Sequence, residues 1–399
     1  MTRTVGSWGA TLGGVLSFVL ILAGCEIYGP DAPTSQVHVL ESFEYIQRLS
    51  AAEIRATELP IDIHYEVDLY RLVYETPSPD GIPVLASGLV AFPVDGPRAP
   101  LVSYQHGTEV LKAGVASVAV LDAGETLVAV AYAASGYVAA MPDYLGLGIS
   151  AGLHPYVHSA SLATSTIDML RAARNLADEL DQDLTGEVFL VGYSEGGNAT
   201  AAAQRAIEAD HSGEFDLVAS APMAGAYDLS GVMVEVMTAD RPYPAPYYLP
   251  FQLLAFDEVY DLFDDLSDVF VAPLDNILPG LYLGTLDAGA INRQLPERPI
   301  QILVPEYLAA FDASPNHLLR QALRENDLYD WRPTTPTRLY HCVDDDLIPF
   351  ENSVVAFNQF QANGAPDVGL EPLDFGGHAD CAAPALLLSK LWFDSLRDL

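Results

Sequence analysis

The chain has 399 residues, of which 50% are hydrophobic and 18% are charged, so it has enough apolar material for a large core and is not of the disordered type. Its length fits one large α/β domain with an insertion. Because 54 acidic residues outnumber 18 basic ones, the formal net charge is −36, and such a surface repels phosphate backbones. This excludes nucleic-acid binding and disfavours unaided docking on anionic lipid.

Residues 1–25 have the pattern of an export signal. Arg3 gives a positive start, and residues 11–24 form an apolar run shorter than the roughly 20 residues that a membrane-spanning helix needs. The run ends in Leu-Ala-Gly-Cys and resembles a bacterial lipoprotein signal, in which the cysteine, here Cys25, is acylated. Glu26 is not the aspartate that retains such proteins at the inner membrane, so we expect an extracytoplasmic protein anchored by lipid to the outer membrane. An ordinary secretory signal or a short membrane anchor is the alternative.

The rest of the chain is predicted to alternate strands and helices. Residues 26–60 are expected to form a linker and then a short amphipathic helix at 39–56. The expected strands are 64–74, 82–94, 101–105, 137–141, 188–191, 217–221, 338–343 and 369–374. The expected helices are 116–135, 159–180, 194–209, 352–362 and 382–396. This alternation predicts an α/β fold with a mostly parallel central sheet flanked by helices.

A long interruption divides the α/β core. We expect the core to comprise residues 61–227 and 336–399, with residues 228–335 forming an inserted helical cap, because a structureless loop of that length is implausible. Helices are expected near 251–263 and 317–324. An apolar cluster in the cap indicates either an acyl-binding site or packing of the cap on the core. Its members are Tyr247, Tyr248, Leu249, Phe251, Leu253, Leu254 and Phe256.

The residues Gly192-Tyr193-Ser194-Glu195-Gly196 match the pattern G-x-S-x-G. The pattern is weak on its own, but here it follows a predicted strand and opens a predicted helix, as in a nucleophile elbow. The glycines are needed because a tight turn of this kind leaves no room for Cβ atoms. Ser194 is therefore the predicted nucleophile, and the backbone N–H of Glu195, at a helix N-terminus, is a predicted oxyanion donor.

A serine hydroxyl needs a base and an orienting acid, which in this fold follow in the order acid, then histidine. His378 follows the last expected strand and is the predicted base. Asp345 lies in the loop after the strand at 338–343 and is the predicted acid, with Asp344 as the alternative. The competing interpretations are a surface-loop histidine and a solvated or calcium-binding run of carboxylates at 344–346.

The second oxyanion donor should come from the loop after the third expected core strand. Gln105-His106-Gly107-Thr108 lies there, and Thr108 is the predicted donor, with Gly107 the next candidate. Residues 142–148 (PDYLGLG) end the following strand and are expected either to line the pocket or to brace this loop.

Cys342 and Cys381 remain once Cys25 is assigned to lipidation. In an oxidising compartment an even pair favours a disulfide, which would tie together two loops that we assign to catalysis. Two separate buried thiols are the alternative.

Together these motifs resemble the α/β-hydrolase fold, and within it the secreted lipase and esterase branch that includes the fungal secretory lipases and their bacterial relatives. The resemblance covers roughly residues 60–399 and rests on SYQHGT (103–108), PDYLGLG (142–148), GYSEGG (192–197), DxxIP (345–349) and GGH (376–378). It implies Ser194 as nucleophile, Asp345 and His378 as its partners, and a cap that shapes an acyl pocket. Cys342 departs from the family, in which a glycine commonly follows the histidine.

The sequence thus predicts a serine hydrolase that cleaves small-molecule carboxylic esters or lipids through a Ser-Asp-His triad and an acyl-enzyme. No cofactor, metal or nucleic-acid partner is expected, and the membrane is a partner through the lipid anchor. A serine peptidase on the same fold and a non-catalytic surface lipoprotein are the alternative functions. An acidic cap is compatible with a peptidase that binds a substrate amine.

Overall fold

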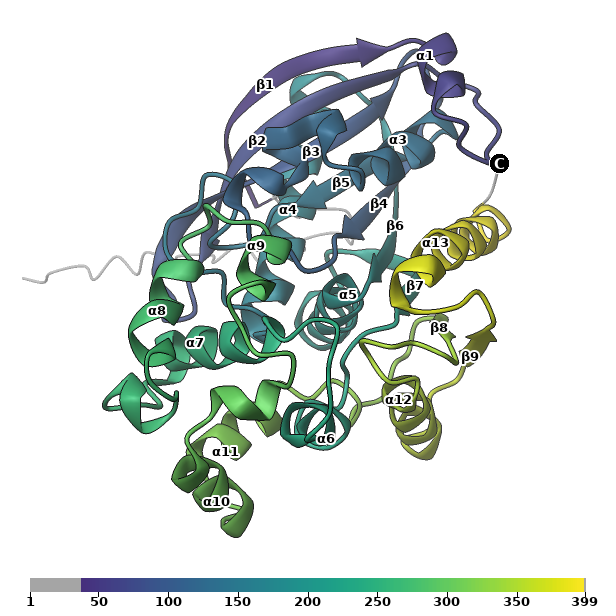
Figure 1. The fold of residues 1–399 in the computed structure, drawn as a ribbon. Helices are drawn as coiled ribbons and strands as arrows, with labels where there is room; N and C mark the ends of the chain where they lie inside the picture. The colour runs from purple at the N-terminus through teal and green to yellow at the C-terminus, as the bar shows by residue number, and fades with distance from the viewer. Residues whose placement is uncertain (1–36, 398–399) are drawn as a thin grey trace, which may run out of the picture. The chain divides into compact units, whose positions relative to one another are not determined.

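The computed structural model describes residues 37–397, which form a nine-stranded sheet with helices on both faces (Figure 1). The predicted signal at 1–25, with Cys25, and the start of the predicted linker lie outside the described residues. The strands are β1 (Leu40–Leu49), β2 (Val67–Pro77), β3 (Pro83–Pro93), β4 (Ala99–Gln105), β5 (Val138–Pro142), β6 (Leu184–Tyr193), β7 (Asp216–Met223), β8 (Thr337–Cys342) and β9 (Val368–Leu373).

The sheet has the order β1-β2-β3-β5-β4-β6-β7-β8-β9. The pairs β1/β2, β2/β3 and β3/β5 are antiparallel, and every later neighbouring pair is parallel. A mostly parallel sheet whose strands are connected through helices is the architecture that the sequence predicted, and the prediction of fold class is confirmed.

Helices follow the strands in the order expected. They are α1 (Ala51–Ala56), α2 (Ala116–Ala119), α3 (Thr126–Ala134), α4 (Ser159–Glu179), α5 (Glu195–Ala206), α6 (Val232–Thr238), α7 (Tyr248–Tyr260), α8 (Leu274–Leu281), α9 (Ala288–Asn292), α10 (Pro305–Ala313), α11 (Leu318–Glu325), α12 (Glu351–Ala362) and α13 (His378–Asp394). Short 3-10 helices occur at Lys112–Gly114, Val120–Asp122, Leu266–Asp268 and Pro299–Ile302, and a π-helical turn at Ile207–His211.

The central strands are buried on both faces, which explains their continuous apolar runs. In β4, Leu101 packs against the side of the sheet that α4 covers, while the next residue, Val102, packs against the side covered by α3 and α13. Successive side chains of a strand point to opposite faces, so each strand contributes to both cores. The two apolar layers fix the height and direction of the loops at the strand ends, where the predicted site lies.

Two predicted elements before β5 are wrong. The single helix expected at 116–135 is divided into α2 and α3, which are separated by the 3-10 helix Val120–Asp122 and a turn that contains Gly124, with a bend of 81°. Residues 39–56, expected to be a helix, form β1, paired antiparallel with β2, and then the short helix α1. Ser50 begins α1 with a capping box, in which its side chain binds the Glu53 N–H and Glu53 binds the Ser50 N–H, so the helix starts later than expected. The ten preceding residues form an edge strand because β2 offers a pairing partner, and this partner is not visible in local periodicity.

Between β7 and β8 the chain forms helices α6 to α11, drawn in green in Figure 1, where they gather at one end of the sheet. Most of the predicted apolar cluster serves as packing here. Tyr247, Phe251, Leu253, Leu254 and Phe256 are buried in the core of this helical segment. Leu249 is buried in the same core and Tyr248 packs against it, and both also line a small cavity described below.

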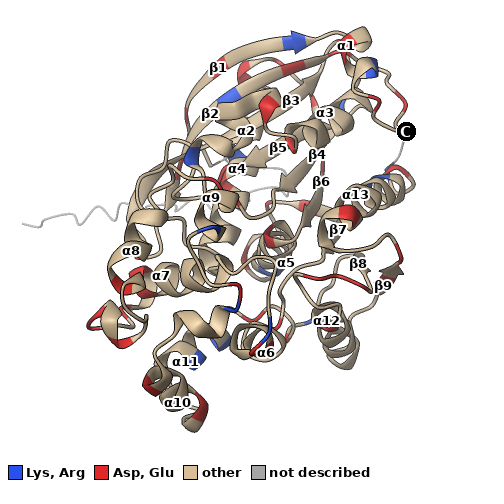
Figure 2. Ribbon diagram, in the orientation of Figure 1, with Lys and Arg blue, Asp and Glu red and all other residues tan. Residues whose placement is uncertain are grey.

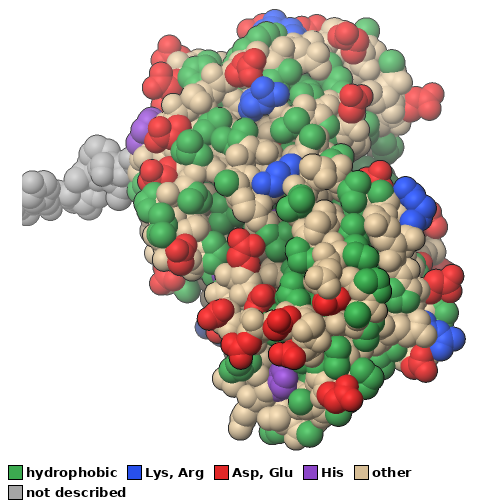
Figure 3. All heavy atoms as spheres, turned by 60° about the vertical axis from the view of Figure 1, so that its left-hand side comes forward, with side chains coloured by type: hydrophobic (Ala, Val, Ile, Leu, Met, Phe, Trp, Pro, Cys, Tyr) green, Lys and Arg blue, Asp and Glu red, His purple; other side chains and the backbone are tan. Residues whose placement is uncertain are grey.

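Acidic side chains are spread over the surface of the chain, and basic ones are sparse (Figure 2; Figure 3). No single described helix is long and apolar enough to cross a membrane. By length and composition alone, one bent pair does pass that test, Ala116–Asp122 with Thr126–Ala134, at an angle of 81°.

Candidate active site

Ser194 is the single residue between β6 and α5, and its backbone has φ 63° and ψ −123°. A residue other than glycine rarely adopts such a backbone conformation. The conformation costs on the order of 1–3 kcal/mol and is found mainly at functional sites. The Ser194 N–H donates to the Met223 carbonyl at 3.0 Å, and its carbonyl accepts from the Gly197 N–H at 2.8 Å. These bonds from β7 and α5 hold the turn in place, and the side chain is 7% exposed.

The glycines on either side of the turn are required by contact with other backbone segments. A Cβ atom on Gly196 would collide with the carbonyl oxygen of Gln105 at the end of β4, and one on Gly192 would collide with the carbonyl oxygen of Gly196. The structure therefore has no room for Cβ atoms at these two positions, as predicted. The close backbone contacts that glycine allows place Ser194 against the end of β4.

His378 and Asp345 lie in direct contact. The Nδ1 atom of His378 is 2.6 Å from Oδ2 of Asp345, and the two side chains are 7% and 0% exposed. Because an ionised carboxylate can only accept, Nδ1 carries the proton and Nε2 is left as an acceptor. Nε2 is buried and has no hydrogen-bond partner among the described residues, so its lone pair is available to take a proton.

Two groups contact each carboxylate oxygen of Asp345, and all of them except His378 belong to its own loop and strand. Its Oδ1 accepts the backbone N–H groups of Leu347 and Ile348 at 2.9 and 2.8 Å, and His341 Nε2 lies 3.2 Å from Oδ2. Burial by itself raises the pKa of the Asp345 carboxyl, but hydrogen bonds from His341 and His378, and their charges, lower it well below its ordinary value. Asp345 is thus an anion in the folded chain, suited to orient the imidazole of His378.

Tyr193 connects the serine turn to the histidine. Its ring lies 4.9 Å from the ring of His378, centroid to centroid, and its hydroxyl donates to the His378 carbonyl at 2.7 Å. Ser194 follows Tyr193 directly in the chain. In the described part of the chain, His378 Nε2 forms no direct hydrogen bond with Ser194. The contacts of Tyr193, a residue that the sequence did not point to, hold His378 close to the serine turn.

The three adjacent aspartates have different environments. Asp346 Oδ1 accepts the His378 backbone N–H at 2.9 Å and so caps α13, whereas Asp344 is exposed. The last helix therefore begins at His378 rather than at residue 382 as predicted, because a cap from a distant loop satisfies its first N–H. Among residues 37–397 no group of three or more His, Cys, Asp or Glu side chains is arranged to hold a metal ion, so the calcium-loop interpretation gains no support.

The loop at residues 106–108 lies beside the serine. A Cβ atom on Gly107 would be 3.8 Å from that of Ser194, which shows how close the two backbones come. The Gly107 N–H already donates to the carboxylate of Glu125 at 3.2 Å, and Tyr104 donates to the same carboxylate at 3.1 Å. Of the two predicted donors in this loop, Thr108 is therefore favoured over Gly107.

Residues 142–148 brace this loop. The Tyr144 hydroxyl donates to the His106 carbonyl at 3.1 Å, and His106 Nε2 lies 3.3 Å from the Asp143 carbonyl. Of the two predicted roles for the segment, bracing is the one that these contacts support.

The side chain of Glu195 makes a buried contact that the sequence did not indicate. Its backbone N–H is at the first position of α5, where the helix itself supplies no acceptor. Its side chain points into the protein, and Oε1 lies 2.7 Å from His154 Nε2, with both side chains at most 2% exposed. His154 Nδ1 in turn lies 2.7 Å from the Leu145 carbonyl, so this buried pair joins the start of α5 to the bracing segment.

Four residues near the site were missed by sequence reasoning: Glu125, His154, Tyr193 and His341. One of them left a signal, because His341 stands four residues before Asp345 at the end of an expected strand. The others act through contacts between distant segments, which a single sequence does not display.

The predicted disulfide is confirmed. Cys342 at the end of β8 is bonded to Cys381 in the first turn of α13, with Cα atoms 6.0 Å apart. The bond joins the strand that leads into Asp345 to the helix that begins with His378. Cys25, the predicted lipidation site, lies outside the described residues.

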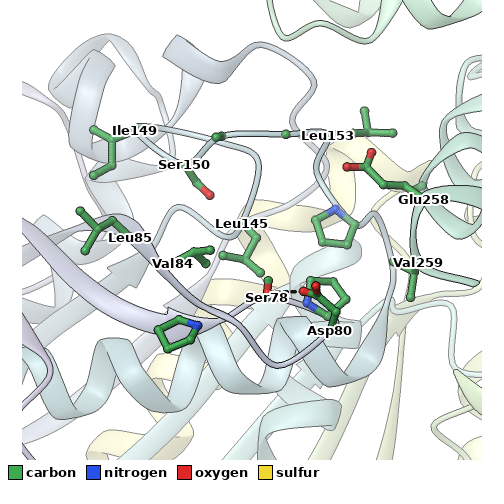
Figure 4. Close-up of a pocket in the computed structure, with 16 residues that line it drawn as sticks. Ser78, Asp80, Val84, Leu85, Leu145, Ile149, Ser150, Leu153, Glu258 and Val259 are labelled. Carbon is green, nitrogen blue, oxygen red and sulfur yellow. Dashed lines mark hydrogen bonds between the residues drawn. The ribbon is translucent and has the colours of Figure 1, made fainter.

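A larger cavity of about 680 Å³ lies elsewhere, between the β2–β3 turn, residues 145–155 and α7 (Figure 4). Asp80 from the turn and Glu258 from α7 carry carboxylates at its wall, among mostly apolar neighbours. None of the predicted catalytic residues lines it.

Comparisons with known proteins agree with the fold described above. Residues 111–240 match the family model described as secretory lipase. The rice cell wall degrading esterase LipA from Xanthomonas oryzae is 30% identical, with a TM-score of 0.82, over 90% of this chain and 99% of that one. A Legionella pneumophila protein described as a hydrolase is 26% identical, with a TM-score of 0.84, over 90% of this chain and 98% of that one. Candida antarctica lipase A in its closed state, 16% identical with a TM-score of 0.68 over 90% and 83%, shares the fold. A search of curated proteins found no match.

Proposed function

The chain belongs to the secretory lipase and esterase branch of the α/β-hydrolases, and on that basis we propose that it is a serine hydrolase that cleaves carboxylic esters through Ser194, His378 and Asp345. The observation that carries the proposal is the contact between His378 and Asp345, which leaves a buried Nε2 beside the Ser194 turn with no hydrogen-bond partner within residues 37–397. A base in this state is what a serine hydroxyl needs in order to attack.

In the proposed reaction, His378 Nε2 takes the Ser194 proton as Oγ attacks the ester carbonyl carbon, and Asp345 stabilises the resulting imidazolium. The tetrahedral oxyanion is held by the backbone N–H groups of Glu195 and Thr108, contacts usually worth ~3 kcal/mol each. The bond to the alcohol oxygen then breaks as His378 protonates the leaving group. Water attacks the acyl-serine with His378 again acting as base, which releases the acid and restores the hydroxyl.

A fluorophosphonate probe tests the nucleophile directly, because it phosphonylates an activated serine. We expect the wild-type chain to be labelled and Ser194→Ala not to be labelled, with labelling of His378→Ala reduced at least a hundredfold. Equal labelling of the wild type and Ser194→Ala, or none of the folded wild type, would favour a non-catalytic lipoprotein instead.

The reaction class is tested by comparing p-nitrophenyl esters with aminoacyl anilides. The relatives support an ester substrate: the Xanthomonas neighbour is an esterase and the matched family is one of lipases. We expect kcat/KM to be larger for the esters. Faster turnover of the anilides would replace the esterase with a peptidase.

We further propose export and lipid anchoring through Cys25, supported by the secretory family match and by the signal pattern at residues 1–25. The mass of the mature N-terminus provides the test. Diacylglyceryl-modified Cys25 is expected, and the substitution Cys25→Ala should abolish the modification. An unmodified N-terminus after cleavage would indicate an ordinary secretory signal.

A further inference from the structure

A small cavity of about 30 Å³ lies under the helical segment, against the proposed active site. Its wall comes from α6 and α7 on one side and from residues of the core on the other. The lining residues are Tyr156, Val157, Leu229, Met233, Val236, Met237, Tyr243, Tyr248, Leu249, Gln252, Pro299 and Ile348. Apart from the tyrosine hydroxyls, Gln252 is the polar side chain in this wall.

Residues that line the cavity contact both the loop of the proposed oxyanion donor and the proposed acid, Asp345. On one side the Tyr156 hydroxyl is 3.3 Å from the Thr108 hydroxyl, next to the proposed oxyanion donor. On the other side, the Ile348 N–H donates to the Asp345 carboxylate at 2.8 Å. Ser194 itself does not line the cavity, but these contacts place the cavity one residue away from Thr108 and from Asp345, and on this ground we take it as the acyl pocket of the proposed function.

Gln252 is unusual among the buried amides near the site. It is 5% exposed, and its Nε2 atom has no hydrogen-bond partner among the described residues. In contrast, the buried Gln105 donates to Ser103 at 2.6 Å and accepts from Thr200 at 2.8 Å. Buried polar groups in folded proteins are normally paired, so an unpaired amide in the wall of a binding pocket points to a partner on the ligand.

We propose that the Gln252 amide donates a hydrogen bond to an oxygen atom on the acyl part of the substrate. The enzyme then prefers esters whose acyl chain carries a keto or hydroxyl oxygen over plain alkanoyl esters of equal length. This inference rests on the proposed function, since it assigns the acyl pocket of that same site.

The position of Gln252 on α7 indicates where that oxygen lies. The ring of Tyr248 stacks on that of Tyr156, with centroids 5.9 Å apart, and the Tyr156 hydroxyl accepts from the Thr108 hydroxyl, so Tyr248 lies near the oxyanion loop. Gln252 is one helical turn further along α7, a rise of about 6 Å. With the ester carbonyl near Tyr248 and the acyl chain running along α7, we expect an oxygen roughly three to five carbons from the carbonyl to meet the amide.

To hold an acyl chain, the cavity must become larger, and in this proposal it does so by movement of the methionine side chains in its wall. Its present volume is smaller than an acyl chain, but Met233 and Met237 form part of its wall. Methionine side chains are unbranched and adapt their shape at small cost. The proposal requires these two side chains to move far enough to admit a chain of five carbons.

The test compares two esters of matched length, p-nitrophenyl 4-oxopentanoate and p-nitrophenyl pentanoate. For each variant the preference is the ratio of the two kcat/KM values, so differences in intrinsic ester reactivity cancel between variants. We expect Gln252→Met, which keeps the length of the side chain and removes the amide, to lower this ratio about tenfold relative to the wild type. Gln321→Met, an exposed glutamine on α11, is the matched control and should leave the ratio unchanged.

A second variant keeps the proposal falsifiable if Gln252→Met does not fold. Gln252→Asn retains the amide but withdraws it by one carbon, so the preferred substrate should shift from 4-oxopentanoate toward 5-oxohexanoate. An unchanged ratio in both variants, or an equal loss on both esters, overturns the assignment of Gln252. Absence of both ester turnover and fluorophosphonate labelling in the wild type would instead overturn the proposed function.

Discussion

Asp346 accepts the backbone N–H of His378 at 2.9 Å, so the residue next to the proposed catalytic acid caps the helix that starts at the proposed base. Two neighbouring carboxylates thus fix one histidine, Asp345 through its ring and Asp346 through its backbone. The start of α13 is therefore set by the loop after β8 and not by its own sequence.

Replacing Asp346 tests this cap. We expect Asp346→Ala to lower the free energy of unfolding by about 1 kcal/mol and kcat by about tenfold, because His378 loses its backbone anchor. Asp346→Asn, which still offers an oxygen, should recover most of both. Asp344→Ala is the matched control, since Asp344 is exposed. The cap is unimportant if urea denaturation and ester kinetics do not distinguish Asp346→Ala from Asp344→Ala.

Glu125 should act as a positioning residue for the oxyanion loop. Its carboxylate binds the Gly107 N–H and the Tyr104 hydroxyl, so Glu125→Ala frees the loop that carries Thr108. We expect kcat to fall about tenfold with KM near the wild-type value, because a displaced donor weakens transition-state stabilisation more than ground-state binding. Glu125→Gln should restore most of kcat, and Asp122→Ala, an exposed neighbour, should have no effect. A change confined to KM would contradict a role in positioning the donor.

The buried pair of His154 and Glu195 should show strong energetic coupling. Oε2 of Glu195 is already without a partner among the described residues, so removing the imidazole would leave the carboxyl group with only the long bond of 3.5 Å from the Val157 N–H to Oε1. We expect His154→Leu to destabilise the fold by about 3 kcal/mol, and the double variant with Glu195→Gln to be less destabilised than the sum of the single variants. Chemical denaturation of the four chains measures the coupling. Additive effects would show that the pair contributes nothing as a unit.

Asp327 should make stability depend on pH. Its carboxylate accepts from the Ser230 hydroxyl at 2.6 Å and so joins the two ends of the segment between β7 and β8. Burial raises the pKa of Asp327 to about 6, although the bonds from Ser230 oppose the shift. Between about pH 4 and pH 6 the folded chain holds a proton that the unfolded chain has released, so the stability contributed by this group falls as pH rises.

Asp327→Asn removes that titration. The difference in unfolding free energy between the wild type and the variant should decrease by about 1–2 kcal/mol from pH 4 to pH 6.5 and be level on either side. A difference between variants is needed because burial lowers the pKa of His158 to about 4, which gives the opposite slope in the same window. If the difference does not change with pH, Asp327 is not the group responsible.

The elements around Ser194 could be predicted from the sequence because their determinants are local. A buried apolar strand, two glycines and an alanine-rich helix follow one another within about twenty residues. The edge strand β1 could not be predicted in the same way, since Leu40–Leu49 becomes a strand by pairing with β2. Likewise, nothing near His154 in the sequence indicates that its partner is Glu195, 41 residues later. Contacts of this kind arise from the fold as a whole and are absent from local patterns.

The bond between Cys342 and Cys381 also has a consequence for when the chain becomes active. In a reducing cytoplasm the two thiols stay apart, and the segment bearing the base is tied to the segment bearing the acid by non-covalent contacts alone. Under the proposed function and the proposed export, newly made chains would then acquire full hydrolytic capacity only outside the cytoplasm. Fluorophosphonate labelling of the folded chain before and after thiol oxidation would reveal this order of events, and equal rates in the two states would rule it out.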